Sequence, residues 1–295
     1  MNNPMQTITQ EHATAPPAPA GRRLLLLPLL LVVFFAFALL AGCGRSDTEE
    51  IIVQSAQAMN GLSNYKGTVE MDLRMAGTAR TTAVRMNTAM DVFTSPFCAK
   101  LLITSENRSG DTTRDYLIDG FVVSESDRIT LYMDMGDSME NPWVKNTFPY
   151  SEALVTAYSP ARYSQLFLDA LEDVVSMEDV SINGTGAWKI DVTLRPAALI
   201  DVLHYTNGAQ SITASITAES LSGAAPVPAS LWIEKDTYYL VQAEMELTSA
   251  FAPAFAAFEV NLHVLSITAT VSDIGRATDF TYPEALRTAP EGILY

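Results

Sequence analysis

A basic start followed by a long apolar run constrains this chain more than any other feature. Arg22 and Arg23 precede residues 24–42, a stretch of 19 residues without a charged side chain. Such a stretch is long enough to span the hydrocarbon core of a bilayer. Because a basic start, an apolar middle and small residues at the end form the layout of a secretory signal, residues 1–43 predict export of the rest of the chain.

The end of this segment, Leu40-Ala41-Gly42-Cys43, resembles the lipobox of bacterial lipoproteins. The resemblance implies that the thiol of Cys43 takes up diacylglycerol, that a palmitate-type acyl anchor results, and that Cys43 becomes the new N-terminus after cleavage. An uncleaved N-terminal anchor helix is the alternative. In both cases the rest of the chain is expected at the extracytoplasmic face of the bacterial cell membrane.

The 252 residues after Cys43 suffice for one large domain or two small ones, and we expect a single domain over residues 44–295. The chain has 34 acidic and 18 basic residues, a net charge of −16, which disfavours nucleic acid and anionic headgroups as partners. Because Cys98 is the one cysteine that comes after Cys43, no intramolecular disulfide is expected in the processed chain.

Alternation of apolar and polar residues predicts strands through most of the chain. Within residues 66–76, Val69, Met71, Leu73 and Met75 face one way and polar or charged residues face the other. Residues 115–124 contain Asp119-Gly120, a hairpin signal that splits this stretch into two strands. Further strands are predicted at residues 82–92, 97–105, 129–135, 143–146, 180–182, 187–195, 211–219, 229–234, 238–247 and 259–274, with hairpin turns at Asn183-Gly184 and Lys235-Asp236-Thr237.

Three helices are predicted between these strands. A capping box at Ser46-Asp47-Thr48-Glu49 opens a short helix that ends at Asn60-Gly61. Ser159-Pro160 opens a second helix, because apolar residues recur at helical spacing from Tyr163 to Val175. A third helix starts at Pro196 and ends at Asn207-Gly208.

Many strands with interposed helices indicate an α+β fold, a strongly curved antiparallel sheet of about ten or eleven strands with helices packed on its concave side. Three segments, NYKGTVEMDLRM, SLWIEKDTYYLVQAEMEL and VSDIGRATDFTYPEAL, resemble bacterial lipoproteins built on the LolA/LolB-like half-barrel, which include the LppX/LprG group. The resemblance covers most of residues 47–285. It implies a concave apolar cavity that accepts acyl chains, and it implies no catalytic residues.

The sequence offers little that supports catalysis or metal binding. It has no G-x-S-x-G elbow, Walker loop or G-x-G-x-x-G motif, and His204 and His263 lack a metal-ligand spacing, so structural roles are expected for both. The acidic stretch with Asp134, Asp137 and Glu140 is either a calcium site or a solvated turn, and its spacing favours the turn. We therefore predict no enzyme activity, no catalytic residue, no metal ligand and no cofactor.

Several apolar residues are candidates for ligand binding instead. Methionines suit a surface that fits varied apolar ligands, although ordinary core packing is the alternative for them. Residues 250–258 are expected to form an uncharged loop with three phenylalanines, which line a ligand mouth, touch a membrane or fold onto the core. If they line a mouth, Phe255→Ser lowers lipid uptake with only a small loss of stability. The candidate set is Met71, Met75, Met86, Met90, Trp188, Trp232, Phe251 and Phe255.

The leading hypothesis is a non-enzymatic, membrane-anchored lipoprotein that binds a lipid or another apolar molecule in the half-barrel. The alternative is an envelope interaction or regulatory lipoprotein whose half-barrel is filled by its own side chains. The sequence does not identify a protein partner for either hypothesis.

Overall fold

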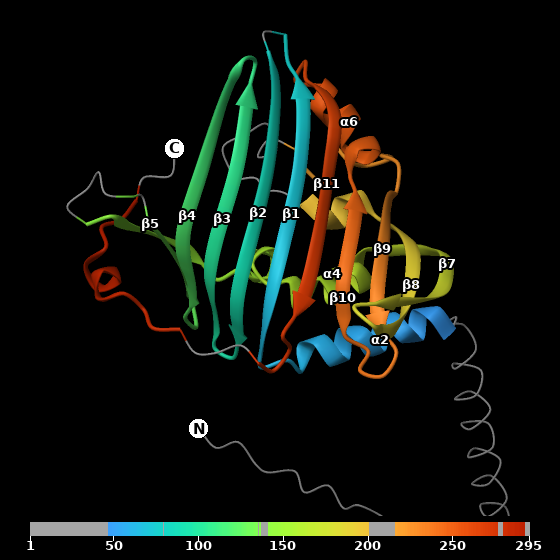
Figure 1. Cartoon of the computed structure of the whole chain (residues 1–295). Coiled ribbons are helices and arrows are strands. Elements are labelled where there is room, and N and C mark those ends of the chain that lie inside the picture. Colours follow the sequence, from blue (N-terminus) through green and yellow to red (C-terminus); the bar gives the residue numbers. More distant parts are fainter. Residues whose placement is uncertain are drawn as a thin grey trace, which may run out of the picture. The chain divides into compact units, whose positions relative to one another are not determined.

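The computed structural model describes residues 47–78, 80–134, 136, 141–200, 216–276 and 280–292 (Figure 1). The chain divides into two compact units, Met1–Ser46 and Asp47–Tyr295, and every described residue belongs to the second. The predicted signal segment and Cys43 therefore lie outside the described residues. None of the helices that the structure describes is long and apolar enough to cross a membrane.

The described chain is built mainly from long strands with a few short helices. The helical elements are α2 (Asp47–Asn60), α3 (Glu152–Ala157), the 3₁₀ turn η1 (Pro160–Arg162), α4 (Tyr163–Ala170), η2 (Pro196–Leu199), α6 (Thr248–Ala256) and η4 (Glu284–Thr288). The strands are β1 (Asn64–Ala76), β2 (Thr81–Thr94), β3 (Phe97–Ser109), β4 (Thr112–Ser124), β5 (Arg128–Asp134), β6 (Trp143–Pro149), β7 (Leu171–Ile182), β8 (Thr185–Leu194), β9 (Val227–Glu234), β10 (Leu240–Glu246) and β11 (Asn261–Ser272).

All eleven of these strands form one antiparallel sheet in the order β6-β5-β4-β3-β2-β1-β11-β10-β9-β8-β7. The first strand pairs with the last, β1 with β11, so two meanders join at the middle of the sheet. The sheet curves and carries α2, α4 and α6 on one side (Figure 1). We call that side the concave face and the opposite side the outer face. The predicted α+β architecture is confirmed.

Strand register determines which side chains share the concave face. Met71 of β1 lies opposite Met86 of β2 and Ile267 of β11, and all three belong to the main hydrophobic core or pack against it. Because side chains alternate along a strand, every second residue from these positions points the same way. The alternation predicted for residues 66–76 is therefore correct, and Glu70 and Arg74 point to the outer face.

The first helix forms over the predicted span, and Ser46 of the predicted capping box lies outside the described residues. Asp47, Glu49 and Glu50 occupy the first turn of α2, where negative charge complements the helix dipole. Ile52, Ser55, Ala56 and Met59 are its buried residues. The helix closes at Asn60, and Gly61 donates its backbone N–H to the carbonyl oxygen of Ala58.

The hairpin predicted at Asp119-Gly120 is wrong, because β4 runs through both residues. Gly120 pairs with Leu101 of β3 and with Met133 of β5, so it sits in the middle of the sheet. A β-carbon at Gly120 would lie 3.0 Å from the carbonyl oxygen of Tyr132. The glycine thus allows close strand packing, and the chain reverses instead at Gly110, whose φ is +58°.

The helix predicted from Pro160 to Val175 is half as long as expected. It is α4, preceded by η1, and it ends at Ala170, after which β7 begins at Leu171. Leu171 pairs with Leu194 and Val174 with Val192, and a register shift comes after each of these pairs. Because each register shift interrupts the side-chain alternation, apolar residues at helical spacing can lie in a strand. Val175 falls at one of these shifts in the edge strand and is 64% exposed.

Two later predictions need correction and a third is only partly tested. Residues 216–219, the described part of the strand predicted at 211–219, form no strand and lead into turns. The third helix starts as predicted with η2, but residues 201–215, including His204, lie outside the described residues. The apolar segment 250–258 is not a loop, because α6 covers most of it.

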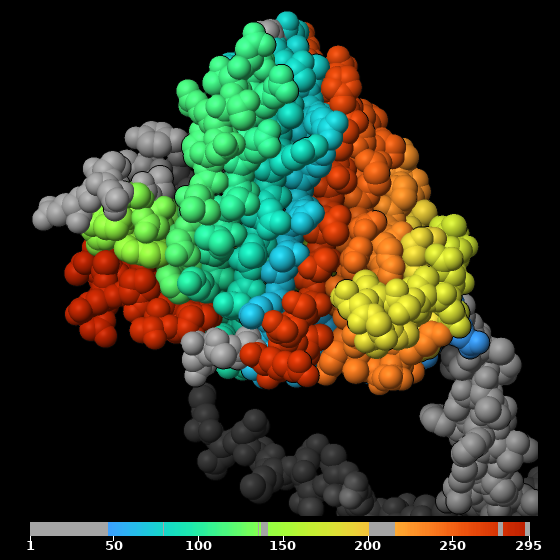
Figure 2. All heavy atoms as spheres, viewed as in Figure 1, coloured from blue at the N-terminus to red at the C-terminus, as the bar shows by residue number. Residues whose placement is uncertain are grey.

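The C-terminal segment packs beside the outer face and forms a small second core. Phe121, Trp143, Leu286 and Ala289 are buried together there. Near its end, the backbone of Glu291 pairs with that of Lys145 in β6 as a single parallel β-bridge. Figure 2 shows this segment next to β5. The strands β4, β3, β2, β1, β11 and β10 lie side by side across the rest of the face.

Candidate functional site

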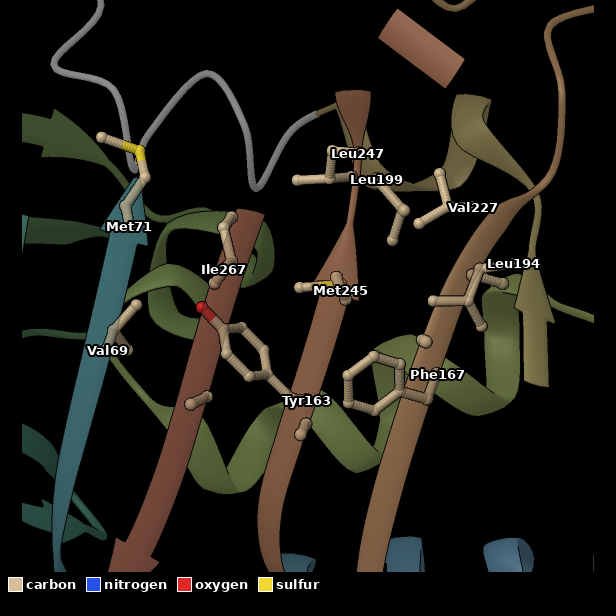
Figure 3. Packing of buried hydrophobic residues seen from close by; sticks show 14 of the residues in the cluster. Val69, Met71, Tyr163, Phe167, Leu194, Leu199, Val227, Met245, Leu247 and Ile267 are labelled. Atoms are coloured by element: carbon tan, nitrogen blue, oxygen red, sulfur yellow. The ribbon is translucent and has the colours of Figure 1, made fainter. Parts of the chain in front are cut away.

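The concave face is closely packed where helices lie over it. Phe167 of α4 and Phe251 of α6 are both fully buried, and Phe255 is 1% exposed. Figure 3 shows Phe167 and Tyr163 rising from α4 among side chains of β1, β8, β10 and β11. The protein's own side chains therefore fill this part of the concave face.

The concave face of β1–β5 is less completely filled. Five apolar side chains there are only partly buried although they point to the same side as the core. Tyr116, in the same row as Met86, is 44% exposed. We call the five residues the accessible concave surface: Met75, Val84, Met86, Ile103 and Met133.

The structure brings the four predicted methionines together on this side of β1 and β2. Met71 and Met86 are directly opposite, Met90 is opposite Gly67, and Met75 is opposite Thr82. Met71 and Met90 are buried, with 4% and 3% of their surface exposed. Met75 and Met86 are half-buried, so the group runs from the packed core to the accessible concave surface.

The two predicted tryptophans lie on different faces. Trp188 is on the concave face near the start of β8, where its ring lies 5.5 Å from that of Tyr238. Lys235 Nζ lies 5.8 Å from the Trp188 ring centre. Trp232 alternates with the buried Leu231 and Ile233, so it points to the outer face, with Lys189 Nζ 5.7 Å from its ring centre. Trp232 is therefore separated from the other candidates.

The predicted phenylalanines belong to α6 and the turn after it. Phe251 and Phe255 are buried against the core, while Phe258 is 44% exposed. A ligand mouth or a membrane contact needs accessible rings, which only Phe258 offers. The premise for a mild Phe255→Ser variant is thus not met, because the Phe255 ring fills space inside the protein.

Polar groups at the base of the concave face were not predicted as site residues. The Tyr65 hydroxyl and Ser159 Oγ are 2.5 Å apart and form a buried hydrogen bond. Burial raises the pKa of Tyr65 to about 12, despite the opposing effect of that bond. The Tyr163 hydroxyl is also buried, and it has no hydrogen-bond partner within the described part of the chain.

The outer face carries a polar groove of about 710 Å³ across β11, β1, β2, β3 and β4. Charged and polar residues line the groove, among them Glu70, Asp72, Arg85, Asn87, Thr104 and Glu106, together with the apolar Met71, Met86 and Leu117. Arg74 Nη2 lies 2.7 Å from Asp72 Oδ2 at its edge. Such a surface suits water better than an acyl chain, because its charges stay solvated or paired.

Among the described residues, no group of three or more His, Cys, Asp or Glu side chains is arranged to hold a metal ion. In the acidic stretch with Asp134, the residues Asp137 and Glu140 lie outside the described residues. Asp134 Oδ1 accepts a hydrogen bond from the backbone N–H of Gly136. This contact is typical of a turn.

No protein-family model and no curated protein matches the chain. Solved structures of similar fold include lipoprotein LppX from Mycobacterium tuberculosis, with 20% identity, a TM-score of 0.43, and 80% of this chain and 100% of that chain covered. LprF from Mycobacterium bovis has 13% identity, a TM-score of 0.45, and coverage of 80% and 96%. A LolA superfamily protein from Nitrosomonas europaea has 8% identity, a TM-score of 0.21, and coverage of 80% and 96%. Values this low leave the function to be argued from the residues of this chain.

Proposed function

We propose that this protein is a non-enzymatic, membrane-anchored lipoprotein that binds a lipid or another apolar molecule on the concave face of its half-barrel. The accessible concave surface carries the proposal. Its five residues point toward the core side of the sheet, yet each keeps part of its surface accessible. A protein that filled this face with its own side chains would bury them.

The chemistry of this surface fits an acyl chain. Each methylene removed from water contributes about 0.8 kcal/mol, so a long chain binds through many small gains. Methionine is flexible and polarisable, which lets Met75, Met86 and Met133 adapt to chains of different shape. The outer groove is a poor competitor for the same ligand, because Asp72, Arg85 and Glu106 line it.

The location proposed for this activity is the extracytoplasmic face of the cell membrane, with Cys43 as the lipid anchor. The support is the sequence of residues 22–43, a basic start and an apolar run that ends in Leu40-Ala41-Gly42-Cys43. An acyl anchor places the binding face close to its source of lipid.

The test is mass spectrometry of lipids that co-purify with the full chain. Met86→Glu places a charge on the accessible concave surface, where burial by a ligand is unfavourable, and should lower the amount of bound lipid at least severalfold. Thr104→Glu is the matched control, because Thr104 is an exposed residue of the outer face and should tolerate the same charge.

Two results would contradict the proposal. One is wild-type protein that purifies without bound lipid and takes up no fluorescent fatty acid. This result favours a half-barrel that acts as an interaction or regulatory module. The other is equal lipid content in Met86→Glu and Thr104→Glu, which would place bound lipid somewhere other than the concave face.

A further inference from the structure

The Tyr163 hydroxyl is a buried polar group that the described part of the fold leaves unsatisfied. Tyr163 has no exposed surface, and among the described residues its hydroxyl has no hydrogen-bond partner. A buried hydroxyl without a partner is unfavourable by the full cost of its desolvation. The neighbouring Tyr65 shows the usual solution, since its hydroxyl bonds to Ser159 Oγ.

The Tyr163 hydroxyl is also aimed at the interior of the half-barrel. Figure 3 shows its oxygen pointing away from α4, between Val69 of β1 and Ile267 of β11. Ile267 lies in the same concave row as Met71 of β1 and Met86 of β2, and Val69 lies one row away along β1. The ring itself is held in place, with its centre 6.1 Å from that of Phe167. The donor therefore lies in the buried core, and the row that contains Ile267 leads from it to Met86 of the accessible concave surface.

The surroundings favour a neutral partner over a charged one. Burial, and to a lesser degree Tyr65, raises the pKa of the Tyr163 hydroxyl, so it stays protonated and able to donate. The adjacent Arg162 interacts with other residues. Its Nη1 donates a hydrogen bond to Asn60 Oδ1 at 3.0 Å and lies 3.9 Å from Glu152 Oε1. An ionised carboxylate or phosphate at Tyr163 would lack the positive charge that burial of an anion requires.

We propose that the Tyr163 hydroxyl donates a hydrogen bond to a neutral carbonyl oxygen of the bound ligand, so that the ligand is an acyl ester or amide. This inference rests on the proposed function and adds the chemical class of the ligand. Free fatty acids and plain hydrocarbons fit less well, because the first bring an unpaired charge and the second leave the hydroxyl unsatisfied. The acyl chain then extends along the accessible concave surface.

Competition labelling of the full chain in maltoside micelles tests this. The probe is a methyl palmitate with a photoreactive diazirine in its chain, and the competitors are methyl palmitate, palmitate and heptadecane. In wild-type protein, methyl palmitate should compete at the lowest concentration. Tyr163→Phe, which keeps the ring, should raise the concentration at which methyl palmitate competes about 3-fold to 10-fold. The concentration at which heptadecane competes should not change.

Tyr65→Phe is the matched control, because it removes a buried hydroxyl that already has a partner. It should lower the melting temperature and leave the preference for ester over alkane intact. Tyr163→Phe should not lower the melting temperature of ligand-free protein, because its hydroxyl has no hydrogen bond to lose among the residues that the structure describes.

The results of this experiment separate a failure of the proposed function from a failure of this inference. Wild-type protein that the probe does not label would contradict the proposed function itself. Labelled wild-type protein in which heptadecane competes as well as methyl palmitate would overturn this inference alone. The same holds if Tyr163→Phe weakens ester and alkane equally, since that result assigns Tyr163 a packing role.

Discussion

Phe255 and Phe258 are three residues apart in sequence but differ in what surrounds them. Phe255 is 1% exposed within α6, and Phe258 is 44% exposed just after it. Removing a buried phenylalanine ring leaves a cavity, so Phe255→Ala should lower the free energy of unfolding by about 3–5 kcal/mol. Phe258→Ala should change it by about 0.5 kcal/mol or less. Urea unfolding followed by tryptophan fluorescence measures both, and equal losses would contradict the assignment of Phe255 to the core.

Some residue-scale features were readable in the sequence and others were not. Trp232 alternates with Leu231 and Ile233, a pattern that already places it on the opposite face from them. The unsatisfied Tyr163 hydroxyl had no such signal. Whether a buried hydroxyl finds a partner depends on segments distant in sequence, as the Tyr65–Ser159 bond illustrates.

At the scale of elements, η1 approaches β1 so closely that the strand needs a glycine. A β-carbon at Gly67 would lie 2.9 Å from Pro160 Cγ and 3.3 Å from the carbonyl oxygen of Thr270. Gly67→Ala should therefore push η1 from the sheet and lower the free energy of unfolding by about 1–3 kcal/mol. Gly186→Ala is the control, since its nearest neighbour is Lys235 Cδ at 3.8 Å. Thermal unfolding that shows both variants equally stable would contradict this packing.

Strand periodicity predicted the elements better than local turn or helix signals did. The Asn183-Gly184 turn was correct because both residues take positive φ, +52° and +83°, between two paired strands. Asp119-Gly120 failed because a glycine also serves where strands pack closely. Leu171 and Val174 fit a helix by spacing, but pairing with β8 and two register shifts made them part of a strand. Tertiary pairing outweighed local preference there.

At the scale of the whole molecule, the predicted curved sheet formed because period-two alternation repeats over most of residues 64–272. The anchor is a separate prediction, since Cys43 lies outside the described residues. If its thiol accepts the lipid, Cys43→Ser should abolish acyl labelling and leave an unprocessed precursor in the membrane. Metabolic labelling with a palmitate analogue measures this. Wild-type protein without acyl label, or a variant that is cleaved and released, would rule out the lipobox.

The central claim, that lipid occupies the concave face, is tested most directly by photo-crosslinking in living cells. Met86→p-benzoylphenylalanine places the crosslinker on the accessible concave surface of the full chain, and Leu117→p-benzoylphenylalanine places it on the outer face, where Leu117 is 69% exposed. After irradiation, intact-mass spectrometry should show a lipid adduct at position 86 and none at position 117. An adduct at position 117 alone, or at neither position, would contradict the claim.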